Sequence, residues 1–127
     1  RTHIILIFNN NELAHYSWIA RGWTNIAFDY FFSEVNFKKQ AYIGPCFTFD
    51  AFKGKGFYGQ ALTQICCELK KMGLEKVYIM TRTKNVSSWK GISKSPFQLT
   101  SLASFNFKFF IGKWSYKKIK NLNDFQK

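Results

Sequence analysis

A glycine-rich segment that leads directly into an amphipathic helix constrains this sequence more than any other feature. The segment covers residues 53–59 and reads Lys-Gly-Lys-Gly-Phe-Tyr-Gly. A glycine-rich turn at the start of a helix lets backbone N–H groups converge on an anion, and a pyrophosphate suits such a loop. From Phe57 to Met72 the apolar positions recur at steps of three and four residues, which predicts a helix. These positions are Tyr58, Ala61, Leu62, Ile65, Cys66, Leu69 and Met72.

The loop differs from the two commonest phosphate-binding loops. A Walker loop needs Gly-Lys-Ser/Thr after four intervening residues, and the sequence has no such run. Gly54, Gly56 and Gly59 do have the spacing of a dinucleotide fingerprint. The acidic residue expected about 20 positions later would be Glu75, which precedes the next strand instead of ending it. This position argues against a Rossmann site.

The flanking segments predict alternating strands and helices. Residues 4–8 and 13–19, joined by three Asn residues, predict a hairpin, whereas residues 21–39 fit neither helical nor strand spacing. Residues 41–49 predict a strand that Gly44 and Pro45 interrupt with a bulge or bend. Gly73 is placed to cap the helix after it. Further elements predicted are a strand over 76–81, a helix from 86 to about 95 that Pro96 stops, and a long extended stretch over 97–111.

Two blocks of this sequence resemble the GNAT superfamily of acyl-coenzyme A-dependent N-acyltransferases. Residues 53–58 are similar to its signature Arg/Gln-x-x-Gly-x-Gly/Ala, although Lys53 and Tyr58 depart from that pattern. Residues 85–88 and 94–97 are similar to its second block, in which Ile92 stands where many members have a Tyr that protonates the departing thiolate. The closest similarity is to members associated with polysaccharide and amino-sugar genes.

The resemblance implies an α+β fold with a central mixed, mostly antiparallel sheet flanked by helices. We expect one acyltransferase domain over residues 1–127, with the core motifs in 42–97. The chain begins at Arg1, so the family's usual N-terminal strand and helices are expected to be missing from it. Exposed edges of such a sheet would also be compatible with a homodimer.

The resemblance further implies that acetyl-coenzyme A is the cofactor. Its pantetheine would lie between the strand at 47–49 and the strand at Tyr78, and its pyrophosphate would lie on residues 54–59. Asn85 and Ser88 have an alternative role as ordinary helix caps, and Lys53 and Lys55 as solvated charges. The implied cofactor-binding residues are Phe47, Thr48, Phe49, Lys53, Gly54, Lys55, Gly56, Phe57, Tyr58, Gly59, Asn85 and Ser88.

The implied reaction is direct attack of a primary amine on the thioester. A backbone amide near 47–49 would polarise the carbonyl, and a base would remove the amine's proton. The candidate bases are His15, Glu34 and Asp50, of which His15 is also a candidate packing residue and Asp50 stands where the family has Pro. The acceptor would be a small-molecule amine, and an amino sugar is electrostatically compatible with a basic protein.

Composition limits the alternatives. The formal net charge of +12 predicts an anionic partner, yet no nucleic-acid-binding motif is present, so a basic nucleic-acid-binding module is a rival hypothesis that we do not favour. A second rival is a GNAT-like domain that binds coenzyme A without turnover. The three cysteines have no metal-ligand spacing, and no metal site is predicted. No apolar run is long enough to span a membrane, so we expect a cytoplasmic protein.

Overall fold

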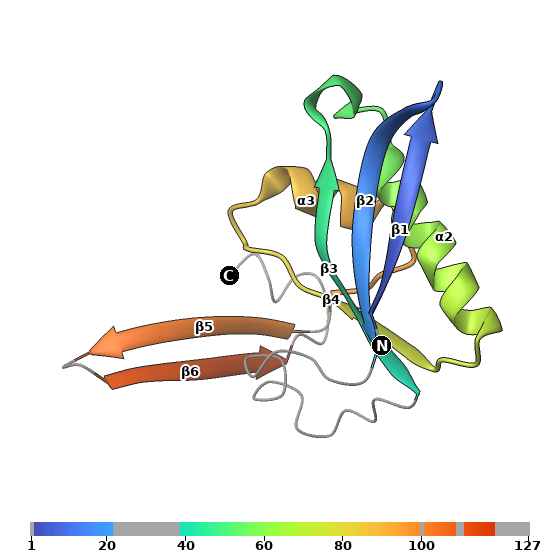
Figure 1. The fold of residues 1–127 in the computed structure, drawn as a ribbon. Coiled ribbons are helices and arrows are strands. Elements are labelled where there is room, and N and C mark those ends of the chain that lie inside the picture. Colours follow the sequence, from blue (N-terminus) through green and yellow to red (C-terminus); the bar gives the residue numbers. More distant parts are fainter. Residues whose placement is uncertain (1, 22–38, 100, 109–110, 119–127) are drawn as a thin grey trace. The chain divides into compact units, whose positions relative to one another are not determined.

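The computed structural model describes residues 2–21, 39–99, 101–108 and 111–118. The chain divides into two compact units, residues 1–96 and residues 97–127, and each is treated by itself. The first unit contains a four-stranded sheet in the order β1-β2-β3-β4, with helices α2 and α3 (Figure 1). Residues 22–38, which include the candidate base Glu34, lie outside the described residues.

The first two strands form the predicted hairpin. β1 (Thr2–Asn9) pairs antiparallel with β2 (Glu12–Arg21). Asn10 and Asn11 form the turn with φ values of 49° and 65°. Asn tolerates this left-handed conformation better than most residues, and two such residues in succession match the twist of a hairpin. The asparagines therefore set the register of the first two strands.

The third strand joins the hairpin to the rest of the sheet. β3 (Gln40–Thr48) pairs antiparallel with β2 and parallel with β4 (Lys76–Ile79). The β2–β3 register shifts so that Gly44 and Pro45 together oppose Trp18, which confirms the predicted interruption as a bulge. The sheet is thus mixed and mostly antiparallel. The fold class is α+β, as the sequence predicted.

Helix α2 (Phe57–Lys71) covers one face of the sheet and passes behind β1 and β2 in the view of Figure 1. Its buried positions include Ala61, Leu62, Ile65 and Leu69, all predicted from the helical spacing. The predicted helix is one residue too long, because Met72 follows the last helical residue, and its side chain is 50% exposed. The remaining core side chains come mainly from the strands: Ala14, Ile19, Ala41 and Ile43.

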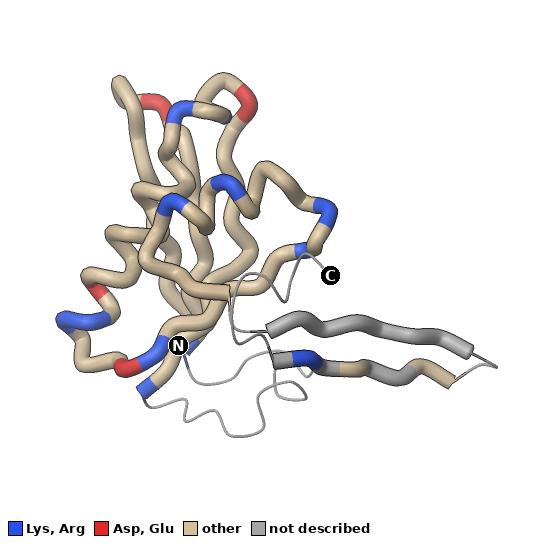
Figure 2. Tube along the Cα trace, turned by 180° about the vertical axis from the view of Figure 1, so that it is seen from behind, with Lys and Arg blue, Asp and Glu red and all other residues tan. Residues whose placement is uncertain are grey.

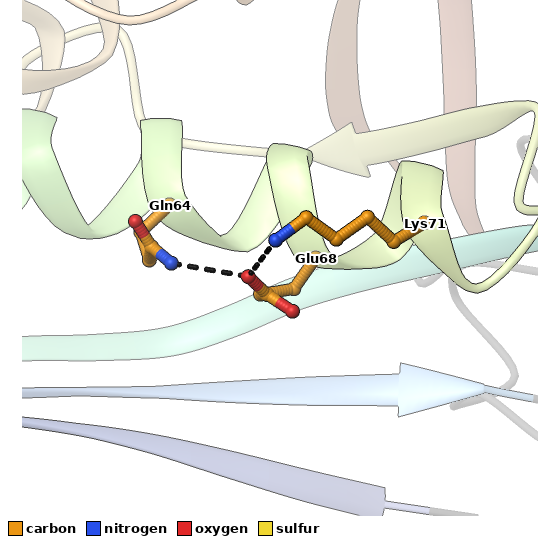
Figure 3. A network of polar contacts seen from close by, with 3 residues as sticks. All are labelled: Gln64, Glu68 and Lys71. Atoms are coloured by element: carbon orange, nitrogen blue, oxygen red, sulfur yellow. Dashed lines mark hydrogen bonds and ion pairs between the residues drawn. The ribbon is translucent and has the colours of Figure 1, made fainter.

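The C-terminal end of α2 follows from local chemistry. Gly73 has φ 80° and donates to the Lys70 carbonyl, and Leu74 donates to the Leu69 carbonyl, which closes the last turn as predicted. On the outer face, Glu68 accepts hydrogen bonds from Gln64 and Lys71 at 3.2 and 3.0 Å (Figure 3). These exposed contacts add little stability, so the helix is held by its buried face.

Helix α3 (Val86–Ser93) follows β4 and contacts α2. In the second unit the predicted long extended stretch is wrong as a single element, since it contains the strand β5 (Ser101–Lys108) and the start of β6 (Ile111–Lys118). These two strands pair antiparallel. In the sequence these strands are separated only by Phe109 and Phe110, which gave no turn signal to divide them. Over the residues that the structure describes, no helix combines the length and apolarity that a bilayer span requires.

Candidate functional site

The parallel pairing of β3 and β4 is short and ends beside a cavity. Its last pair is Ile43 with Ile79. β3 then bulges at Gly44 and Pro45 and continues along β2, while β4 ends. A cavity of about 310 Å³ lies at the end of this pairing, a place that we call the β3–β4 wedge. Its lining residues come from β3, the end of β4 and the segment after it, and the first turns of α2 and α3: Tyr42, Ile43, Gly44, Pro45, Cys46, Tyr58, Ile79, Met80, Thr81, Arg82, Asn85 and Ser88.

The glycine-rich loop adjoins the cavity through the first turn of α2. Gly54 and Gly56 have φ values of 76° and 85°, a conformation that glycine adopts without strain. Gly56 is the N-cap of α2 and no side chain caps the helix, so the first N–H groups have no intrahelical acceptor. A Cβ at Gly54 or Gly56 would meet nothing within 4 Å. The loop therefore presents accessible backbone donors at the positive end of a helix.

The two lysines of the loop have different surroundings. Lys53 forms an ion pair with Asp50 at 2.5 Å, on the surface. Lys55 lies over the ring of Phe52, with 5.5 Å between its ammonium nitrogen and the ring centroid. Both lysines are exposed, so an anion at the loop could recruit either charge.

Three of the predicted site residues lie together in the cavity wall: Tyr58, Asn85 and Ser88. The Tyr58 hydroxyl lies 3.4 Å from the Ser88 hydroxyl. The Asn85 side chain accepts a hydrogen bond from the Ser88 amide at 3.1 Å, so Asn85 caps α3 in addition to lining the cavity. Burial raises the pKa of Tyr58 to about 12, so this phenol is protonated at neutral pH.

The predicted residues 47–49 do not line the cavity. Phe47 and Phe49 are exposed and form an aromatic cluster with Tyr16, whose ring stacks on Phe47 at 5.6 Å. The Phe49 amide donates to the Ala14 carbonyl, so it is engaged in the sheet. Because successive strand residues alternate in direction, Thr48 points to the other face and contacts His15.

Two of the candidate bases, His15 and Asp50, are not among the residues that line the cavity, although the His15 ring lies beside that of Tyr58. His15 is 1% exposed, and both ring nitrogens are engaged, Nδ1 with the Thr48 hydroxyl and Nε2 with the Ser17 hydroxyl, each at 2.7 Å. Burial lowers the pKa of His15 to about 4, so the imidazole is neutral at pH 7. Asp50 is exposed, and the hydrogen bond from Lys53 lowers the pKa of its carboxyl group. In this structure His15 has the contacts of a packing residue.

Several lining residues were missed by sequence reasoning: Tyr42, Cys46, Met80 and Arg82. For Tyr42 and Cys46 the interruption at Gly44 and Pro45 was the available signal, because residues beside a bulge change direction where a strand leaves its neighbour. Nothing in the sequence pointed to Met80 or Arg82. The thiols of Cys46, Cys66 and Cys67 are all free. Among the described residues, no group of three His, Cys, Asp or Glu side chains could hold a metal ion.

The charged residues around the site are mostly basic. Between Lys76 and Pro96 the sequence contains no Asp or Glu. α3 and the segment before it carry only basic charges, at Arg82, Lys84, Lys90 and Lys94. Figure 2 shows more basic than acidic positions along the described backbone. Such a surface attracts anionic ligands.

This chain resembles known proteins in its fold and not in its sequence. No protein-family model matches the sequence, and no curated protein matches it. Solved structures that share its fold include three at TM-scores of 0.56–0.61. An N-acetyltransferase from Staphylococcus aureus Mu50 is 16% identical, with a TM-score of 0.61 over 91% of this chain and 66% of that chain. YycN from Bacillus subtilis, described as an acetyltransferase, is 19% identical, with a TM-score of 0.58 over 76% of this chain and 55% of that one.

The third structure is the aminoglycoside N-acetyltransferase AAC(6')-Iy, solved in complex with CoA. It is 12% identical, with a TM-score of 0.56 over 75% of this chain and 66% of that chain. This chain therefore spans between about half and two-thirds of the length of the acetyltransferases that it resembles. At these identities the likeness establishes the fold alone: this chain shares its α+β fold with these acetyltransferases.

Proposed function

We propose that this chain is an acyl-coenzyme A-dependent N-acyltransferase that transfers an acetyl group to a primary amine. The observation that carries the proposal is the cavity at the β3–β4 wedge, which adjoins the uncapped N-terminus of α2. A pyrophosphate would be held by the N–H groups of residues 54–59, and a pantetheine arm would enter the wedge. The fold shared with acetyltransferases, one of them solved with CoA, supports this assignment.

The residues of the site suit this substrate. Gly54 and Gly56 leave the loop backbone accessible, and the lysines around the loop favour the phosphate groups. Pro45 and Ile79 supply apolar atoms to a lining that is otherwise mostly polar, and the pantetheine could pack against these two side chains. In the reaction, the amine nitrogen attacks the thioester carbonyl, the C–N bond forms, and the C–S bond breaks with the electron pair leaving on sulfur. The amine's proton passes to water.

The proposed acceptor is a small-molecule amine. The basic surface favours an acceptor with an anionic or neutral body over a polyamine. An amino sugar meets this condition, and AAC(6')-Iy acts on aminoglycosides, as its name states. A panel of amino sugars, aminoglycosides and acidic peptides, with released thiol as the readout, would identify the class.

Thermal unfolding with acetyl-coenzyme A tests the proposed cofactor site. Ligand at about 100 times its dissociation constant stabilises the folded state by about 2.7 kcal/mol, which raises the Tm by several degrees. We expect this rise in moderate salt, and a smaller rise with ATP, which carries similar charge but no pantetheine. Lys55→Ala should reduce the rise, whereas Lys70→Ala, an equal charge change at the far end of α2, should not. An equal response to ATP and acetyl-coenzyme A would contradict the proposal.

A second candidate function is binding of coenzyme A without turnover. The observation in its favour is that no His, Asp or Glu lines the cavity among the described residues. Coenzyme A binding without thiol release across the amine panel would support this candidate over catalysis. Thiol release with any amine of the panel would exclude it.

A further inference from the structure

The sheet of the first unit has one face that α2 covers and one that it does not. The covered face includes His15, which is buried on β2 and whose ring lies beside that of Tyr58 on α2. Successive residues of a strand point to opposite faces, so Tyr16 points away from α2. In the view of Figure 1 α2 passes behind β1 and β2, so the uncovered face of these strands is turned toward the viewer.

The residues on the uncovered face form a continuous apolar surface across three strands. Leu6 of β1 pairs with Tyr16 of β2, which pairs with Phe47 of β3. In the next row Ile4 pairs with Trp18, which opposes the bulge in β3. The rings of Tyr16 and Phe47 stack, and a third ring meets both edge-on. We call this surface the open face; it consists of Ile4, Leu6, Phe8, Tyr16, Trp18, Phe47 and Phe49.

The open face is exposed, and the strands that form it carry almost no charge. All of its members except Tyr16 are between 38% and 57% exposed. The only charged residues of β1, β2 and β3 are Glu12 and Arg21, the first and last residues of β2. In the whole chain one residue in five is charged. The solvent-facing side of an antiparallel sheet is ordinarily polar, so an apolar one indicates a contact surface.

The area of the open face is sufficient for a specific contact between two chains. A large apolar side chain has a surface of about 150–250 Å², so the exposed parts of these six side chains amount to about 500–600 Å². An apolar patch of this size on a single chain is often functional. Two such faces in contact would bury at least about 1,000 Å², the size at which specific interfaces begin.

A second copy of this chain suits the open face better than a charged partner does. Nucleic acids and acidic proteins are held by basic side chains, and none of the described residues that form the open face is basic. Two antiparallel sheets, in contrast, pack face to face at about 10 Å with their side chains interdigitated. A two-fold axis through the contact gives both copies the same neighbours, so the assembly closes at two chains.

We propose that this chain forms a homodimer through the open face, with the aromatic side chains of β2 and β3 at the centre of the contact. The inference does not rest on the proposed acyltransferase function, because no residue of the open face lines the cavity. The net charge of +12 on each chain opposes association, so apolar burial must drive it. Screening of this repulsion by salt should therefore strengthen the dimer.

Analytical ultracentrifugation of the 127-residue chain tests the dimer. We expect nuclease-treated protein at about 100 µM to sediment as a dimer, with a dissociation constant in about 0.5 M NaCl that is equal to or lower than in about 0.1 M. Wild type that is monomeric under both conditions would overturn the inference. A dimer that salt dissociates would overturn it as well, because charged groups would then hold the two chains together.

Substitutions in the open face test where the contact lies. Leu6→Lys and Phe47→Lys should each raise the dissociation constant of the dimer about 100-fold or more, because an unpaired charge would be buried in the contact. Met72→Lys is the matched control, since Met72 is an exposed apolar residue at the end of α2, and it should dimerise as wild type does. If a lysine variant does not fold, the serine variant at that position replaces it, with about ten-fold weakening expected. A dimer that persists unchanged in the folded variants at both positions uses another surface, such as the edge of β1, and the inference is then wrong.

Discussion

The contact between Tyr58 and Gly91 makes Gly91→Ala an informative substitution. Gly91 lies within α3, and a Cβ there would be 2.1 Å from Cδ1 and 2.9 Å from Cε1 of Tyr58. These are ring atoms near the Tyr58 backbone, so they cannot move aside as the end of a flexible chain would. The new methyl group must rotate the ring from its position or push α3 away from α2.

The size of the effect follows from two opposing contributions. Replacing Gly by Ala inside a helix ordinarily stabilises it by about 0.8–1.0 kcal/mol. Overpacking a buried contact costs about 1–3 kcal/mol, and a separation of 2.1 Å belongs at the upper end of that range. We therefore expect a net loss of about 1–2 kcal/mol. In a Tyr58→Ala background the space is open, and the same substitution should stabilise by up to about 1 kcal/mol.

Urea or thermal unfolding of the four proteins of this double-mutant cycle measures the coupling, which we expect to be about 2–3 kcal/mol. Ser87→Ala, an exposed position on the same helix, serves as the control and should change stability by less than about 0.5 kcal/mol. If Gly91→Ala stabilises the protein while Tyr58 is present, the ring does not occupy the space beside Gly91. The packing argument for Tyr58 would then be refuted.

Two further predictions concern the helix cap and the buried imidazole. Asn85→Ala should lower the free energy of unfolding by about 1 kcal/mol, because the Ser88 amide loses its acceptor, whereas Asn85→Asp should keep most of it; equal losses in both variants, measured by urea unfolding, would argue against capping. For His15, the folded pKa of about 4 lies below the unfolded value of 6.5, so the unfolded chain binds more protons and stability should decline by about 3 kcal/mol as pH falls from 6.5 to 4. His15→Gln should remove this part of the pH dependence, and an unchanged profile would contradict the assignment.

The sequence by itself determined the elements whose signals are local. The three- and four-residue spacing within 57–72 specified which face of α2 is buried, and Gly73 specified its end. The asparagines at 10 and 11 specified the hairpin, and Asn85 the start of α3. Each of these signals depends on sterics or hydrogen bonds within a few residues, so it can be recognised without knowing what packs against the element.

Only the tertiary structure decided which side chains meet at the site. The bulge at Gly44 and Pro45 places Cys46 in the cavity wall, and the register of β3 on β2 places Thr48 on His15 and Phe47 on the opposite face. A shift of the β2–β3 pairing by one residue would move each of these side chains to the opposite face of the sheet. Tyr58 was predicted as a site residue because its backbone N–H belongs to the glycine-rich loop. Its side chain also lines the cavity, because Gly91, 33 positions later, leaves room for the ring. Contacts between residues so distant in sequence depend on packing, which no local pattern encodes.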